Sequence, residues 1–249
     1  MNLFLLTMRY LTVLPVGRHS DKIFSKDEFA KGIVFFPVIG LIVGLLSYVA
    51  YFLGNYVSWG GFACLLVVLT QIILTGAFHL DGLADSCDAL FSARKKERML
   101  EIMKDSRIGT NGVVAVIFDV ALKVSLLNSM DYRFIFPAIV LMPAVGETAV
   151  ALLADSVYAR KEGLGDTYIG RISDQYFVIT LSIGFIFSVL IGGIYGVLPF
   201  IAVAAAAFLF RKFVEHKIGG MTGDTLGAGV EIAEVVFLVA LSLERWLYF

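Results

Sequence analysis

Long apolar runs that carry almost no charge are the feature that most limits what this chain can fold into. About 20 apolar residues cross the roughly 30 Å core of a bilayer as a helix, the form that satisfies its own backbone hydrogen bonds there. The 249 residues are 59% hydrophobic and only 16% charged, and the mean hydropathy is +0.86. We therefore predict an all-α, polytopic transmembrane helix bundle, one integral membrane domain over residues 1–249. Seven runs are candidates, or six spans if a shorter one is re-entrant: 33–53, 60–78, 113–128, 134–154, 176–191, 194–210 and 228–246.

The N-terminal segment, residues 1–15, is apolar but too short to cross the bilayer. It has no basic region ahead of its apolar core and no small-residue cleavage pattern, so it does not resemble a removed signal peptide. We expect a short interfacial helix that ends at Pro15. The net charge of −1 gives no reason to expect nucleic acid, and Cys64 and Cys87 have neither a disulfide framework nor zinc spacing.

Basic residues are concentrated in alternate loops. Of the 20 Lys and Arg, 16 lie in residues 16–32, 79–112, 155–175 and 211–227, whereas the intervening turns hold only Arg133. Loops rich in Lys and Arg face the cytoplasm. We therefore predict a protein of a prokaryotic cytoplasmic (inner) membrane whose catalytic loops, about 79–112, 155–175 and 211–227, face the cytoplasm. The C-terminus is expected outside, and the oligomeric state, a homo-oligomer included, stays open.

The loop at residues 79–112 holds three aspartates at helical spacing. At about 100° per residue, Asp81, Asp85 and Asp88 fall within an arc of about 60°. Carboxylates this close repel one another unless a cation lies among them, and hard oxygen ligands suit Mg²⁺. We therefore predict a magnesium site at these three aspartates. Lys104 and Arg107 of the same loop are suited to a phosphate bound to the metal.

The same loop offers several candidates for a general base. His79, Asp88 and Asp105 are all able to accept a hydroxyl proton, and the sequence does not choose among them. Glycine-rich segments at residues 163–171 and 219–229 fall on the same predicted membrane face. Because glycine lets the backbone approach a phosphate closely, we expect these segments to contribute to one site with the aspartates.

A second group of charged residues lies within the apolar runs. Asp119 and Lys123 are four residues apart, which predicts an ion pair on one helical face. Glu147 lies mid-run and is expected to be structural. Glu231 and Glu234 follow the last glycine-rich segment, where metal or substrate contact and interhelical hydrogen bonding are equally open alternatives.

Several motifs together resemble the cobalamin synthase (adenosylcobinamide-GDP ribazoletransferase) family. They are RYLTVLPV, FFPVIGLIVG, FHLDGLADSCDALFSARKKERMLEIMKDSRIGTNG, YARKEGLG and GGMTGDTLGA, in this order from Arg9 to Glu234. The resemblance implies a Mg²⁺-dependent integral membrane transferase that joins adenosylcobinamide-GDP to α-ribazole, or to its 5′-phosphate, and releases GMP. The residues at matching or neighbouring positions in the central loop are His79, Asp81, Asp85, Asp88, Lys104, Asp105, Ser106 and Arg107. The substrate-binding candidates are Ser106, Arg160, Gly219, Gly220 and Asp224.

The implied reaction is a phosphoryl transfer, in which we expect the ribose 5′-hydroxyl to attack the phosphorus bound to cobinamide. Such reactions depend mainly on positioning and cationic stabilisation. Two other classes of protein remain open. A CDP-alcohol-type membrane phosphotransferase also uses aspartates beside Asp-Gly, but it needs an arginine after the alanine, where this chain has Asp85. An ion-coupled transporter would use the acids inside the spans as a relay.

Overall fold

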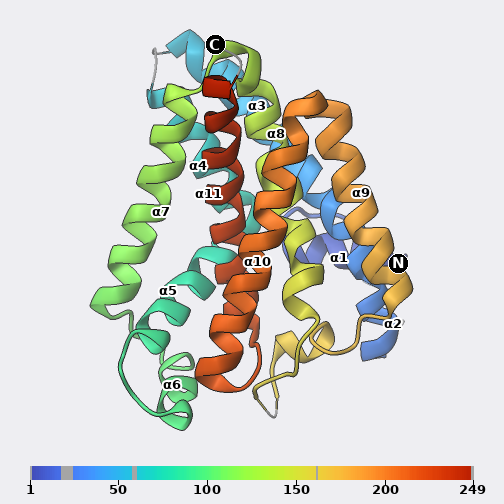
Figure 1. Cartoon of the computed structure of the whole chain (residues 1–249), viewed down its shortest axis with the longest axis vertical. Coiled ribbons are helices and arrows are strands. Elements are labelled where there is room, and N and C mark those ends of the chain that lie inside the picture. The colour runs from blue at the N-terminus through green and yellow to red at the C-terminus, as the bar shows by residue number, and fades with distance from the viewer. Residues whose placement is uncertain (1, 18–24, 58–60, 161, 248–249) are drawn as a thin grey trace.

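The computed structural model describes residues 2–17, 25–57, 61–160 and 162–247, and within these residues the chain is almost entirely helical (Figure 1). Residues 18–24, counted above among the charged loops, and Gly60 lie outside the described residues. The α-helices are α1 Leu3–Leu11, α2 Lys26–Ala30, α3 Phe36–Val57, α4 Gly61–Thr75, α5 Phe78–Leu90, α6 Lys96–Ile102, α7 Thr110–Ser129, α8 Tyr132–Ala154, α9 Asp174–Gly192, α10 Val197–Ile218 and α11 Gly223–Leu247. Three 3₁₀ helices are η1 Lys31–Phe35, η2 Leu164–Thr167 and η3 Gly193–Gly196.

In the part of the chain that the structure describes, five helical stretches are long and apolar enough to cross a membrane, or six if the bent pair α4 and α5 is counted as one span. The longest of the five, Asp174–Ile218, doubles back on itself. The Ser188 hydroxyl donates to the Gly196 carbonyl at 2.8 Å, and the ring centroids of Phe185 and Phe200 lie 5.4 Å apart. Residues 8 and 15 positions apart in a straight helix would be about 12 and 22 Å apart. This stretch is therefore an antiparallel pair, α9 and α10 (Figure 1).

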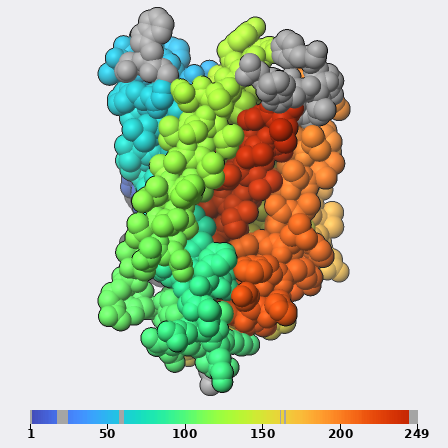
Figure 2. Space-filling view, turned by 60° about the vertical axis from the view of Figure 1, so that its left-hand side comes forward, coloured from blue at the N-terminus to red at the C-terminus, as the bar shows by residue number. Residues whose placement is uncertain are grey.

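The predicted all-α, polytopic bundle is confirmed, and α1, with nine residues, is too short to span. The core of the bundle is α8, of which nearly every residue from Pro137 to Ala154 is buried. Helix α3 packs closely on it, because Gly40 and Gly44 leave room for the α8 backbone at Pro143 and Val140. Helix α11 is the other inner helix. It is visible as a strip between α7 and α10 in Figure 2.

The three loops that hold most of the charge lie at one end of the bundle. Helices α5 and α6, the start of α7 and the end of α10 meet at the bottom of Figure 1, and the C-terminus lies at the opposite end. The segment at Tyr158 reaches the same end and forms an isolated β-bridge with Met221. Segments that are far apart in sequence therefore share one face of the protein.

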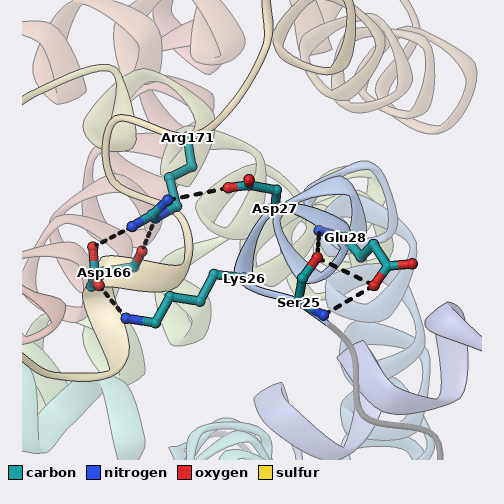
Figure 3. Close-up of polar contacts among 6 residues, drawn as sticks. All are labelled: Ser25, Lys26, Asp27, Glu28, Asp166 and Arg171. Atoms are coloured by element: carbon teal, nitrogen blue, oxygen red, sulfur yellow. Dashed lines mark hydrogen bonds and ion pairs between the residues drawn. The ribbon is translucent and has the colours of Figure 1, made fainter.

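An ion network fastens the loop after α8 to the N-terminal part of the chain (Figure 3). Asp166, in η2, pairs with Lys26 of α2 and with Arg171, at 3.1 Å from the latter. Arg171 also pairs with Asp27 at 3.1 Å. Lys26 and Asp27 are largely exposed and Asp166 and Arg171 partly so, and ion pairs that water reaches contribute little to stability. The network therefore mainly orients the loop.

Candidate active site

Helix α5, which carries the three predicted aspartates, turns away from α4 by 90°. The turn is made at Gly76 and Ala77, which have φ angles of 63° and 60°. The left-handed conformation ends α4 after only 15 residues. Because α5 carries three carboxylates and runs across the direction of α4, we place it at the membrane surface, outside the spans, as the sequence predicts.

The inner face of α5 packs on the start of α11. A methyl group at Gly82 would lie 2.6 Å from the Asp224 carbonyl oxygen, so a glycine is required for this close approach. Thr222 and Thr225 bond reciprocally at the start of α11: each hydroxyl accepts from the other residue's backbone N–H. These bonds satisfy N–H groups that the first turn of a helix leaves free. Because these bonds fix the first turn of α11, Asp224 in that turn has a fixed position opposite α5.

Three carboxylates, Asp81, Asp85 and Asp224, form the electrostatic centre of this end of the protein. Partial burial, followed by the negative charges of Asp224 and Asp81, raises the pKa of Asp85 to about 7. Asp81 itself is exposed. Mutual repulsion of this kind is what a bound cation relieves, so the cluster has the electrostatics of a cation site.

Arg160 is the cation that the structure places beside these acids. Its Nη2 lies 2.6 Å from Asp224 Oδ2, and its positive charge opposes the upward shift of the Asp85 pKa. The position of Arg160 follows from backbone pairing: Ala159 N–H donates to the Met221 carbonyl at 2.9 Å, and Met221 N–H donates to Val157 at 2.8 Å.

Gly219 and Gly220 allow the backbone pairing with Met221. Their role in the site is to shape the backbone, not to contact the aspartates. Gly219 ends α10 in the left-handed region with φ 75°. At Gly220, with φ 157°, any side chain would collide with the Val157 carbonyl. The two glycines therefore position Arg160 and Asp224 relative to each other.

Asp88 faces the start of α7. Its Oδ2 accepts from Gly109 N–H at 2.6 Å and its Oδ1 accepts from Gly112 N–H at 2.8 Å. A carboxylate here satisfies free N–H groups and opposes the positive end of the helix dipole. Asp88 thus bonds to the backbone of α7, whereas Asp224 of α11 lies with Asp81 and Asp85.

His79 points into the bundle. It is buried, and its Nε2 lies 2.9 Å from Oε1 of Glu147 on α8. Glu147 is buried as well. The first residue of the HLDGLAD motif therefore contacts the interior of the protein, whereas Asp81 faces its surface.

The remaining residues of the central loop are exposed and lie between α6 and α7. Lys104 and Ser106 face solvent. Arg107 donates to both oxygens of Asp105, at 3.0 and 2.7 Å, and these hydrogen bonds lower the pKa of the Asp105 carboxyl to about 2. Neither Lys104 nor Arg107 makes an ion pair with the aspartates of α5.

The donor set fits Mg²⁺ by its chemistry. In the described part of the chain, no three His, Cys, Asp or Glu side chains stand ready to hold a metal ion. Mg²⁺, however, commonly takes one or two carboxylates and completes its shell with water and substrate phosphate oxygens. The carboxylates of Asp81, Asp85 and Asp224 supply hard oxygens of that kind.

Two features of the site escape the sequence. Asp224 is predicted there only as a substrate contact, yet it joins the aspartates of α5. Tyr158 is not predicted at all, although its buried hydroxyl lies beside Gly163 and near Arg160 and finds no hydrogen-bond partner among the described residues. Its position two residues before Arg160 in YARKEGLG is the only signal the sequence offers.

Comparison with known proteins places this arrangement in a family. The family model described as cobalamin-5-phosphate synthase (CobS) matches residues 3–242. The chain belongs to the cobalamin-5-phosphate synthase family. It is 46% identical over 243 residues to adenosylcobinamide-GDP ribazoletransferase of Clostridium novyi (strain NT), covering 95% of each chain. It is 41% identical over 245 residues to the protein of the same name from Escherichia coli (strain K12), covering 96% of this chain and 98% of the relative.

No solved structure matches this cobalamin-5-phosphate synthase family member. The model match reaches from α1 to within α11, so it includes every segment that forms the carboxylate cluster. The family assignment and the geometry thus concern the same residues.

Proposed function

We propose that this protein joins adenosylcobinamide-GDP to α-ribazole, or to α-ribazole 5′-phosphate, and releases GMP. The observation that carries the proposal is the cluster of Asp81, Asp85 and Asp224 beside Arg160, at the end of the bundle where the charged loops meet. The names of the relatives support the substrates. We further propose that this end faces the cytoplasm of a prokaryotic cell, because its loops hold most of the Lys and Arg.

The reaction is a phosphoryl transfer that balances without a further reactant. A ribose hydroxyl oxygen forms a bond to the phosphorus attached to cobinamide, the bridging P–O bond to the second phosphorus breaks, and GMP leaves. The expectation that the 5′-hydroxyl attacks is corrected here. A family described by the product cobalamin-5-phosphate keeps a phosphate on the 5′ oxygen, so a hydroxyl of the ribose ring is the nucleophile.

The acids and Arg160 have separate roles in this proposal. Asp81, Asp85 and Asp224 would hold Mg²⁺, which when bound supplies positive charge to the diphosphate oxygens. Arg160 would bind a nonbridging oxygen and stabilise the charge that builds up in the transition state, exchanging Asp224 for phosphate as its partner.

The proposed site needs little help from a dedicated general base, because a loose phosphoryl-transfer transition state depends mainly on positioning and charge. Asp88 is engaged with α7, His79 with Glu147 and Asp105 with Arg107. Asp81 is exposed, so the hydroxyl proton can leave to solvent.

The two rival functions are not favoured. A CDP-alcohol phosphotransferase needs an arginine where this chain has Asp85. A transporter would need unengaged acids along a path through the membrane. Here Asp119, Glu231 and Glu234 all contact Lys123 instead.

Product analysis tests the proposal directly. The purified protein in detergent is mixed with adenosylcobinamide-GDP, α-ribazole and Mg²⁺. We expect adenosylcobalamin and GMP in equal amounts, and adenosylcobalamin 5′-phosphate with GMP when the nucleoside carries a 5′-phosphate. Competition by CMP but not GMP, or uptake into sealed vesicles without a covalent product, would refute the assignment.

A further inference from the structure

A network of charged side chains is buried inside the bundle, next to α5 but apart from the carboxylate cluster. Lys123 of α7 contacts Asp119 at 3.1 Å, Glu234 of α11 at 2.7 Å, and Glu231 of α11. The predicted Asp119–Lys123 pair is therefore confirmed, but it belongs to a larger group. His79 and Glu147 line the same cavity as this group.

This network ties together the helices that build the proposed site. Lys123 links α7 to α11, and the His79–Glu147 contact links α5 to α8. Charged side chains are costly inside a membrane protein and are usually functional there. An apolar contact of equal size would hold the helices without that cost, so the directional geometry of the ion pairs is what they add.

At its closest points the contact between α5 and α11 is made by glycines, beside a small apolar cluster of Leu80, Leu83 and Ala228. Gly82 faces the backbone of Asp224, and a methyl group at Gly227 of α11 would lie 3.2 Å from the His79 Cα. Glycine contacts allow close approach, and apolar packing is not directional, so neither specifies the position of one helix along the other as a hydrogen bond does. A hydrogen bond from a third helix adds that directional restraint.

Glu147 supplies that restraint. It reaches from α8 to the first turn of α5, two residues before Asp81. Its exposed fraction is 4% and that of His79 is 5%, so water does not compete for the contact. At the other end of α5, Asp88 bonds to the start of α7. The helix is thus held at both ends, with Asp81 and Asp85 between the two attachments.

We propose that Glu147, acting through His79, is a positioning residue that sets the place of α5 on α11 and so keeps Asp81 and Asp85 opposite Asp224. The expected effect on turnover rests on the proposed function, whereas the expected effect on the position of α5 does not. A misplacement of about 1 Å can lower a rate by about 10²-fold. Glu147 is therefore expected to affect turnover although it touches no substrate.

The thiol of Cys87 provides a readout that does not depend on activity. It lies on α5, is half-buried, and packs against Leu80, Leu83 and Ala228. Cys64 on α4 is 2% exposed and serves as an internal control. The rate at which a maleimide modifies each thiol is followed by peptide mass spectrometry in membrane vesicles, without substrate or Mg²⁺. Turnover and the activation constant for Mg²⁺ are measured in parallel.

Three variants of Glu147 and one control are compared. Glu147→Leu should raise the modification rate of Cys87 by about tenfold, as expected when a buried hydrogen bond to a charged group is lost, and should raise the Mg²⁺ activation constant. Glu147→Asp keeps the charge but shortens the side chain, so it should show the same effects more weakly. Glu147→Gln keeps an acceptor for His79 and should stay within about twofold of the parent rate. The control, Thr148→Val, alters a buried hydroxyl that bonds only within α8.

The outcomes separate positioning from general stability. If Glu147→Leu lowers the melting temperature but leaves both the Cys87 rate and the Mg²⁺ constant at parent values, the proposal is wrong. If Glu147→Leu does not yield folded protein, Glu147→Asp decides by the same criteria. If the Cys87 rate rises in a protein that makes no cobalamin product even without substitution, the positioning inference stands and the proposed function falls.

Discussion

Asp88 offers the sharpest test of which aspartates hold the proposed Mg²⁺. Replacing it by alanine removes both acceptors for the Gly109 and Gly112 N–H groups at the start of α7. Loss of a helix cap costs about 0.5–2 kcal/mol, and loss of a buried hydrogen bond to a charged group about 1.5–3 kcal/mol. Because Asp88 is only half-buried, we expect a total near 2 kcal/mol.

For a chain of this size, that loss corresponds to a fall in melting temperature of roughly 4–8 °C. The measurement is thermal unfolding in detergent without Mg²⁺, paired with the Mg²⁺ activation constant of the transferase reaction. Asp88→Asn keeps one oxygen acceptor and should lose less than half as much stability. The activation constant should change by less than about threefold in either variant, which corresponds to less than about 0.7 kcal/mol. An unchanged melting temperature together with a tenfold weaker Mg²⁺ response would show that Asp88 is a ligand after all.

Three further outcomes follow from the site. Asp81→Ala and Asp85→Ala should each keep less than about a tenth of the activity, measured by product formation, because removing a charge-stabilising group costs this much or more. Recovery of each variant from membranes should show that membrane insertion is intact. Because the pKa of Asp85 is about 7 and its ionised form is the one that binds a cation, kcat/KM should fall about tenfold between pH 8 and pH 6, and higher Mg²⁺ should move this fall to lower pH in the pH profile. Arg160→Gln should lower kcat by about 10²-fold while the melting temperature changes little, because the side chain acts on charge that develops during the reaction; an effect confined to KM would instead assign Arg160 to ground-state binding.

The fold follows from the sequence because hydrocarbon imposes a simple rule on backbone groups. Runs of apolar residues become helices, and the length of each run indicates whether that helix can cross the bilayer. One expected span behaves differently: the run over residues 60–78 stops as a straight helix at Thr75, because Gly76 and Ala77 adopt left-handed conformations. Nothing in the hydropathy of that run marks the bend, since an alanine at positive φ is uncommon.

The sequence names the aspartates of the candidate site, but it does not show how the fold groups them. Helical spacing places Asp81, Asp85 and Asp88 on one arc, but spacing says nothing about which neighbouring helix competes for each side chain. Asp88 accepts hydrogen bonds from free N–H groups at the start of α7, and Asp224 of α11 lies near Asp85. Such choices depend on how helices pack, which no local pattern encodes.

The buried network shows the same limit. The four-residue spacing of Asp119 and Lys123 predicts their pair correctly. Glu231 and Glu234 join the same lysine only because α11 lies against α7, so of the two alternatives for these acids the interhelical one is observed.

The surface ion network at Asp166 has a practical consequence for handling the protein. The Debye length shrinks from about 8 Å at physiological ionic strength to about 3 Å at 1 M salt, so exposed pairs such as Arg171 with Asp27 weaken as salt is added. The buried contacts of Lys123 are shielded from that screening. Concentrated salt during purification would thus weaken the attachment of the loop after α8, which contains Arg160, at concentrations that leave the buried contacts between the helices intact.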